Sequence, residues 1–131
     1  MDKIEYDLAG QVIGLAMKVH STLGPGFLES VYQNALAYEL RKAGLEIETE
    51  IRLKVRYEGI VVGEFDADML VNKALIIENK AVLSLVIAHE VQLVNYLVAT
   101  GIDEGLLLNF GAPHLEFKKK HRIYRPSARE T

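Results

Sequence analysis

The sequence predicts a mixed α/β domain, with helices flanking a central mixed sheet in the element order ααβββαββ. Apolar residues recur at helical spacing up to residue 43, alternate with charged residues over 45–57, and return to helical spacing over 84–100. Elements of both kinds in one short chain are expected to form one sheet flanked by helices. With 131 residues, half of them apolar, residues 1–131 are expected to form a single domain.

Two helices are expected in the N-terminal third of the chain. The first covers about residues 7–22 and ends before Gly24-Pro25-Gly26, because two glycines and a proline break a helix. The second covers about residues 27–43, and Gly44 stands where a left-handed C-terminal cap is expected. Its buried face is predicted to include Leu28, Val31, Ala35 and Tyr38.

The clearest element is a strand over residues 45–57. Its odd positions carry Leu, Ile, Thr, Val or Tyr and its even positions carry Glu, Arg or Lys, as a strand with one solvated face requires. A Glu-Gly turn at 58–59 leads to a second strand through residue 71, and an Asn-Lys turn at 72–73 leads to a third over 74–82.

The remaining chain is predicted to hold a third helix and two more strands. Ser84 can begin the helix, which runs through Thr100 and stops at Gly101, and its apolar residues predict that it is well buried against the sheet. A buried strand over 104–110, a more polar edge strand over 114–124 and a short tail over 125–131 complete the chain.

Composition limits the kinds of protein this can be. The 15 basic and 18 acidic residues give a net charge of −3, which argues against a protein that coats nucleic acid with its whole surface. Without cysteine, a metal must be bound by oxygen or imidazole ligands. We expect a cytoplasmic protein, because the N-terminus lacks a signal-peptide pattern and no apolar run approaches the roughly 18 residues of a membrane span.

Asp68, Glu78 and Lys80 form the candidate chemical site. Glu78 and Lys80 point to the same face of a strand, and Asp68 lies near the end of the neighbouring strand. The strand around Glu78 and Lys80 is otherwise apolar, so these charges are costly to bury unless they are paired or bind an ion. Two carboxylates from adjacent strands suit Mg²⁺ or Mn²⁺, and a lysine beside the attacking water can stabilise charge on a phosphate.

Several motifs follow one another in a recognisable order. Residues 26–32, GFLESVY, fit G-x-x-E-x-x-Y; Asp68 precedes an E-x-K at 78–80; and residues 92–96 fit Q-x-x-x-Y. In this order and spacing the chain resembles the GxxExxY family of the PD-(D/E)XK nuclease superfamily. The resemblance implies an αβββαβ core and nuclease activity. It also implies roles for individual residues: metal ligands Asp68, Glu78 and Glu29; catalytic residues Lys80, Glu78, Asp68 and Gln92; accessory residues Tyr96 and Tyr32.

Two neighbours of the motif residues, Asp66 as a further accessory residue and Asn79, also bear on the site. Asp66 is predicted to share a strand face with Asp68, where it could be a third ligand or the residue that truly aligns with the metal aspartate. Asn79 is predicted to point away from Glu78 and Lys80 and to face a helix or a subunit contact.

Each further site residue also has a structural interpretation. Glu29 lies in the first turn of a helix, where the helix dipole alone favours a carboxylate. Gln92 and Tyr96 share one helical face, so Tyr96 could be core while a buried Gln92 bonds a neighbour such as Lys80.

The C-terminal segment is basic. Residues 116–131 hold six Lys/Arg and two Glu, a charge of +4, which leaves −7 for residues 1–115. Lys118, Lys120 and Arg122 would share one face of the last strand, where they could contact phosphates or form a solvated edge. Both interpretations remain open.

The sequence as a whole predicts a Mg²⁺-dependent (or Mn²⁺-dependent) phosphodiesterase that hydrolyses DNA or RNA, with DNA the expected partner. The alternative is an inactive nucleic-acid-binding or protein-interaction module that keeps the nuclease fold, possibly as a homodimer. The acid, acid, lysine set favours the enzyme, and the acidic composition favours the alternative.

Overall fold

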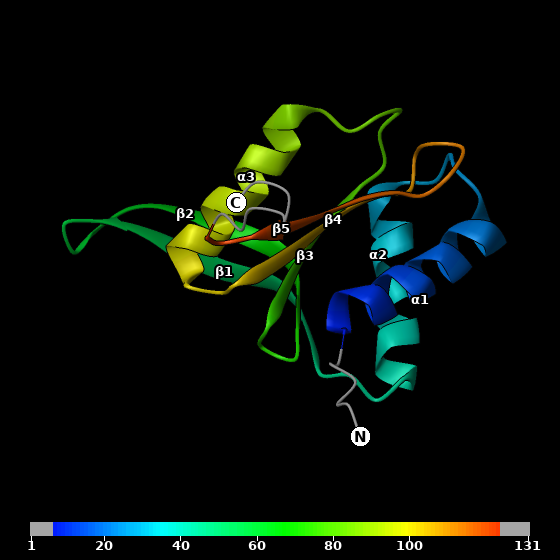
Figure 1. Ribbon diagram of the computed structural model, residues 1–131, viewed down its shortest axis with the longest axis horizontal. Coiled ribbons are helices and arrows are strands. Elements are labelled where there is room, and N and C mark those ends of the chain that lie inside the picture. Colours follow the sequence, from blue (N-terminus) through cyan, green and yellow to red (C-terminus); the bar gives the residue numbers. More distant parts are fainter. Residues whose placement is uncertain (1–6, 124–131) are drawn as a thin grey trace, which may run out of the picture.

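The computed structural model describes residues 7–123, which contain three helices and five strands in the expected order ααβββαββ (Figure 1). The predicted tail at 125–131 and the last residue of the predicted edge strand, Tyr124, lie outside this range. None of the helices within 7–123 is long and apolar enough to cross a membrane. The elements are α1 (Leu8–Leu23), α2 (Glu29–Lys42), β1 (Ile47–Tyr57), β2 (Ile60–Val71), β3 (Leu75–Lys80), α3 (Ile87–Thr100), β4 (Glu104–Asn109) and β5 (Glu116–His121).

The strands form one mixed sheet in the order β1-β2-β3-β4-β5. Neighbouring strands are antiparallel except β3 and β4, which are parallel because α3 carries the chain back between them. Helices α1 and α2 cover one face of the sheet and α3 covers the other (Figure 1). The predicted edge position of the last strand is therefore confirmed.

Each face of the sheet has its own hydrophobic core. Alternate residues of β3 point into the two cores. Ile77 packs with the α1 and α2 side chains, and Ile76 packs with Leu93 and Leu97 of α3. Helix α3 lies close to β4, since a Cβ on Gly105 would come within 2.9 Å of the Leu93 side chain. Because β3 is covered on both faces, its polar residues Glu78 and Asn79 are buried as well, whereas Lys80 at its end is half-buried.

The predicted buried face of α2 is wrong for Leu28, Val31 and Tyr38, whereas Ala35 packs against the core. Leu28 is 77% exposed and Tyr38 is 63% exposed. The helix is rotated so that Tyr32 faces inward and stacks on Phe110, with ring centroids 4.9 Å apart. The buried residues of α2 are Tyr32, Gln33, Leu36, Ala37 and Leu40.

Helix α3 is shorter and more exposed than predicted. It begins at Ile87, because the preceding segment is held in a loop by hydrogen bonds from Val82 N–H to Asn109 and from Leu85 N–H to Glu116. Its fully buried residues are Leu93 and Leu97. The prediction that this helix is well buried is therefore wrong.

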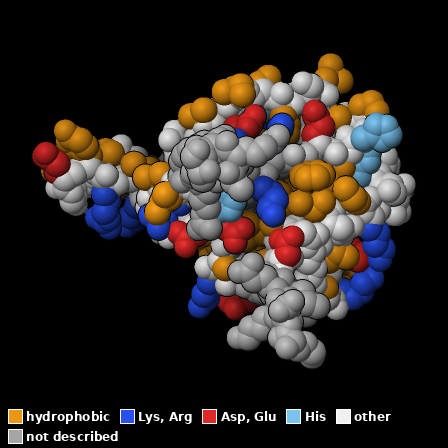
Figure 2. Space-filling view, viewed as in Figure 1, with side chains coloured by type: hydrophobic (Ala, Val, Ile, Leu, Met, Phe, Trp, Pro, Cys, Tyr) orange, Lys and Arg blue, Asp and Glu red, His pale blue; other side chains and the backbone are white. Residues whose placement is uncertain are grey.

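The β1–β2 hairpin projects beyond the rest of the molecule (Figures 1 and 2). The predicted single solvated face does not run its whole length: Ile47 packs in the core under α1 and α2, whereas Leu53 packs in the core under α3. At the point where Glu50 lies opposite Asp68, the side chains of both strands switch from one face of the sheet to the other, while the pairing register stays the same. Glu50 has a left-handed backbone there, with φ 52°. Beyond this point Val55 and Tyr57 are exposed.

Candidate active site at the fork of β2 and β3

Strands β2 and β3 separate at Asp68. Their ladder ends where Met69 pairs with Ile77. Past that pair, the N–H of Asp68 donates to Glu78 Oε2 at 2.9 Å, and the N–H of Asn79 donates to Asp68 Oδ2 at 2.7 Å. Each carboxylate thus takes the place of a carbonyl of the partner strand, and the fork holds Asp68 and Glu78 side by side.

The two carboxyl groups share this fork at a high electrostatic cost. Burial, followed by the neighbouring charge of Asp68, raises the pKa of Glu78 to about 8. Burial also raises the pKa of Asp68, although the hydrogen bond from Asn79 N–H opposes that shift. Lys80 acts in the opposite direction on both pKa values but does not cancel the effect of burial.

Two further acids lie around the fork. Glu29, the first residue of α2, has a raised pKa because of burial and of the charge of Asp68. Glu50 raises the pKa of both Glu29 and Asp68. The sequence analysis did not single out Glu50, because it belongs to the row of alternating charged residues on β1 that is typical of a solvated face.

A buried amide pair supports the fork from the side of α2. The side chain of Gln33 donates to Glu50 Oε1 at 2.8 Å, and Asn79 Nδ2 donates to Gln33 Oε1 at 3.4 Å. Asn79 is fully buried and faces α2, as predicted. Sequence reasoning missed Gln33, which looks like any other polar residue of a surface helix.

Tyr96 borders the fork from the side of α3. Its pKa is raised by burial and then by the charges of Glu78 and Asp68, whereas a hydrogen bond with Gln92 lowers it. The Tyr96 ring stacks on Phe65 with centroids 3.8 Å apart. Gln92 is exposed, so the expectation that it is buried is wrong, and the side chain that it bonds is Tyr96.

The motif Gly26-x-x-Glu29-x-x-Tyr32 acts as a structural unit. The hydroxyl of Tyr32 donates to the carbonyl of Gly24 at 2.5 Å and accepts from the N–H of Phe27 at 3.1 Å. Gly26 has φ 114°, a left-handed value that favours glycine. These contacts fix the loop before α2 and so position Glu29 at the fork.

Three of the other four predicted site residues are engaged in ion pairs. Asp66 pairs with Arg52 at 2.6 Å. Lys120 pairs with Glu90 at 2.5 Å and Arg122 with Asp103 at 2.9 Å. Of the three predicted phosphate contacts, Lys118 alone has no ion pair within the described part of the chain.

The chemistry of the fork fits a divalent cation. Asp68 and Glu78 place carboxylate oxygens side by side, and these are ligands of the kind that Mg²⁺ and Mn²⁺ prefer. Within residues 7–123, no three His, Cys, Asp or Glu side chains lie close enough to hold a metal together. The protein therefore offers a pair of carboxylates rather than a closed cage.

Comparison with known proteins agrees with this architecture. The family model described as PD-(D/E)XK nuclease superfamily matches residues 6–122. The chain belongs to the PD-(D/E)XK nuclease superfamily. This membership confirms the expected fold, in which Asp68, Glu78 and Lys80 lie on the second and third strands of the nuclease-like sheet.

A solved structure shares the fold of this PD-(D/E)XK domain. The crystal structure of SSO0001 superposes with a TM-score of 0.58 at 22% sequence identity, and the match covers 74% of this chain and 52% of that chain. The matched part thus spans about half the length of that relative. A search of curated proteins found no match. The likeness to SSO0001 shows the fold alone.

Proposed function

We propose that this domain is a divalent-metal-dependent phosphodiesterase that hydrolyses nucleic acid at the β2–β3 fork. The observation that carries the proposal is the pairing of the buried carboxyl group of Glu78 with the half-buried carboxyl group of Asp68, both with raised pKa values. A structural domain gains nothing from such a pair, whereas a metal site requires it. Membership of a nuclease superfamily supports the same chemistry.

Each residue at the fork has a defined part in this proposal. Asp68 and Glu78 hold the cation, and Glu29 contributes directly or through water. A bound Mg²⁺ or Mn²⁺ would supply Lewis acidity toward the phosphate. Lys80 orients the water whose oxygen bonds to phosphorus, and it stabilises the charge on the phosphate while the bond to the leaving oxygen breaks.

The remaining site residues support these groups. Gln92 and Tyr96 add hydrogen bonds at the α3 side of the fork, and Tyr32 positions Glu29 through the loop before α2. The fit of Gly26 and Tyr32 to their structural roles supports the finer assignment to the GxxExxY family. Asp66, already paired with Arg52, is the weakest candidate ligand of the set.

The identity of the partner is a further part of the proposal. DNA is the expected substrate, with Lys118, Lys120 and Arg122 as predicted phosphate contacts. The ion pairs of Lys120 and Arg122 reduce the positive charge that this strand can offer to a phosphate. A homodimer remains a prediction, to be tested by analytical ultracentrifugation.

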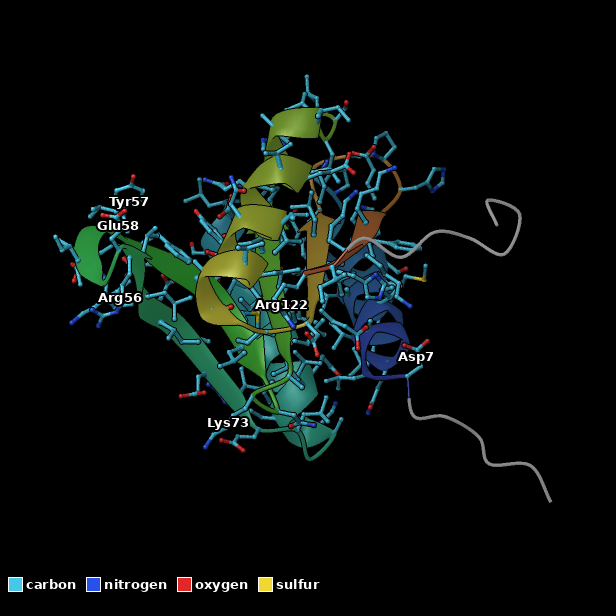
Figure 3. All side chains as sticks on the ribbon, turned by 60° about the vertical axis from the view of Figure 1, so that its left-hand side comes forward. Asp7, Arg56, Tyr57, Glu58, Lys73 and Arg122 are labelled. Carbon is cyan, nitrogen blue, oxygen red and sulfur yellow. The ribbon has the colours of Figure 1, made fainter. Side chains whose placement is uncertain are left out.

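The test is a cleavage assay of the purified protein on single- and double-stranded DNA and RNA, with Mg²⁺, Mn²⁺ or EDTA. We expect metal-dependent cleavage, and we expect Lys80→Ala to lower its rate by at least about 100-fold while metal binding and folding persist. Lys73→Ala is the matched control, because Lys73 lies exposed at the β2–β3 turn, away from the fork (Figure 3).

Two results would overturn parts of this proposal. Undiminished cleavage by Lys80→Ala would remove Lys80 from the mechanism. Nucleic-acid binding without cleavage under every metal condition would instead support the inactive binding module.

A further inference from the structure

A groove of about 610 Å³ lies between the projecting β1–β2 hairpin and α3. This volume is within the range of about 300–1,000 Å³ that ligand sites occupy. Tyr96 and Phe65 line the groove, and both pack against the core under α3 that contains Ala67, the chain neighbour of Asp68. The groove therefore adjoins the fork, where the scissile phosphate is proposed to lie.

The groove offers apolar and aromatic surface. Val55 comes from the hairpin and Val98 from α3, and the stacked pair Phe65 and Tyr96 connects the two walls. Asn95 adds an amide that can donate and accept hydrogen bonds. Such a surface suits the flat face of an unstacked base, whereas the bases of a duplex keep their faces stacked on one another.

The groove is also bordered by positive charge. Lys54 and Arg56 line it, and neither forms an ion pair with any residue between 7 and 123. Their strand neighbour Arg52 is neutralised by Glu64 and Asp66, at 3.1 and 2.6 Å. Figure 3 places Arg56 on the projecting hairpin, near the turn that carries Tyr57 and Glu58. Unmatched cations beside an apolar surface complement the phosphate and the base of one nucleotide.

We propose that this groove binds an unpaired nucleotide next to the scissile phosphate, so that the substrate is a single strand of nucleic acid. The base packs on Phe65, Val55 and Val98, and Lys54 and Arg56 contact the adjoining phosphates. The proposal rests on the proposed function, because it takes the fork as the place of hydrolysis.

The first test measures binding apart from hydrolysis. Labelled single-stranded DNA, single-stranded RNA and duplex DNA of one sequence are titrated with the full chain in EDTA, and fluorescence anisotropy is followed at several salt concentrations. We expect a single strand to bind at least about tenfold more tightly than the duplex. The DNA and RNA arms show which single strand is preferred. Equal or tighter binding of the duplex would overturn the proposal.

The second test removes the two cations. The double variant Lys54→Gln/Arg56→Gln should bind a single strand more weakly and lower the salt slope by about 1.4, from about 0.7 for each of two phosphate contacts. The control Arg41→Gln/Lys73→Gln makes the same change of charge away from the groove and should keep the wild-type slope. Equal effects of the two pairs would contradict a local contact.

The third test closes the groove. Val98 and Val91 are both exposed on α3, at 61% and 52%, but only Val98 lines this groove. Val98→Glu should weaken single-strand binding at least about fivefold, because a carboxylate inside the groove repels phosphate, and Val91→Glu should not. Equal behaviour of the two variants would overturn the proposal.

A small phosphodiester without a base separates this proposal from the function of the fork. Its hydrolysis with Mn²⁺ depends on Lys80, and it should be unaffected by Val98→Glu. Failure of the wild type to hydrolyse both this compound and nucleic acid would count against the fork. Normal hydrolysis without single-strand preference would count against the groove alone.

Discussion

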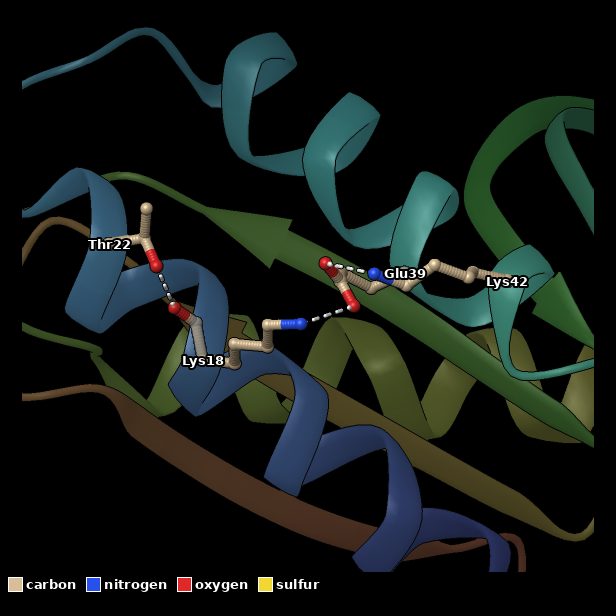
Figure 4. A network of polar contacts seen from close by, with 4 residues as sticks. All are labelled: Lys18, Thr22, Glu39 and Lys42. Atoms are coloured by element: carbon tan, nitrogen blue, oxygen red, sulfur yellow. Dashed lines mark hydrogen bonds and ion pairs between the residues drawn. The ribbon is translucent and has the colours of Figure 1, made fainter.

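Two groups of charged side chains in this fold have opposite electrostatics. Where α1 packs on α2, Glu39 lies between Lys18 at 3.2 Å and Lys42 at 3.5 Å, and these lysines lower the pKa of Glu39 (Figure 4). At the fork, burial and a neighbouring acidic charge, that of Glu50 on Asp68 and that of Asp68 on Glu78, raise both pKa values despite Lys80. In the first group, the negative charge of Glu39 is balanced by lysines of the protein itself. The second keeps an excess of acidic groups that Lys80 does not offset, as the proposed metal site requires.

The largest expected effect is the thermal response to metal. A divalent ion that binds only the native state should stabilise it by about 2.7 kcal/mol at a hundred times its dissociation constant, a melting shift of roughly 5 to 15 °C. Glu39→Gln should keep this response, because Glu39 lies outside the fork. Thermal melts in EDTA and in millimolar Mg²⁺ or Mn²⁺ measure it, and an unchanged wild-type melting temperature would count against the site.

Neutralising a carboxylate should have opposite signs in the two regions. Without metal, Glu78→Gln or Asp68→Asn removes an acid whose raised pKa reflects the cost of holding it in the fold, and it leaves an oxygen to accept the backbone N–H. Stability should therefore rise by something on the order of 1 to 3 kcal/mol. Glu39→Gln should lower the melting temperature, because it loses favourable charge. Metal-free melts of the three variants decide the point, and a fall in stability for Glu78→Gln would instead indicate a structural ion pair.

The two regions should also respond oppositely to pH. The folded pKa of Glu78 lies above its ordinary value of 4.5, at about 8, so the native state holds an extra proton across this window. Metal-free stability should therefore fall as pH rises from 4.5 to 8, by at most about 1.4 kcal/mol per pH unit. The lowered pKa of Glu39 contributes stability above its unfolded pKa, which is lost as pH falls. Urea unfolding at several pH values should show a shallower slope for Glu78→Gln.

Hydrophobic periodicity and turn residues in the sequence were sufficient to predict most of the fold. The ααβββαββ order, the turns at 58–59 and 72–73, and the Gly101 stop all follow from periodicity and turn chemistry. The buried face of α2 and the exposure of α3 could not be predicted, because they depend on which side chains meet across the sheet. Tyr32 stacking on Phe110 is such a long-range contact.

The candidate site was predictable where it lies on neighbouring strands. Asp68 and Glu78 meet because a tight turn joins their strands, which the sequence shows directly. Glu50 and Gln33 were missed because their place at the fork depends on β1 and β2 turning over opposite Asp68, and no local pattern marks that point.

The central claim, that Asp68 and Glu78 bind a divalent cation, is tested most directly by counting protons released on metal binding. With a pKa of about 8, Glu78 is protonated roughly ten to one at pH 7, so a metal that binds its carboxylate must displace that proton. Titration calorimetry with Mn²⁺ in buffers of different ionisation enthalpy should give close to one proton released at pH 7 and almost none at pH 9.5. Glu78→Gln should release none. Binding without proton release, or binding that Glu78→Gln leaves unchanged, would contradict the account.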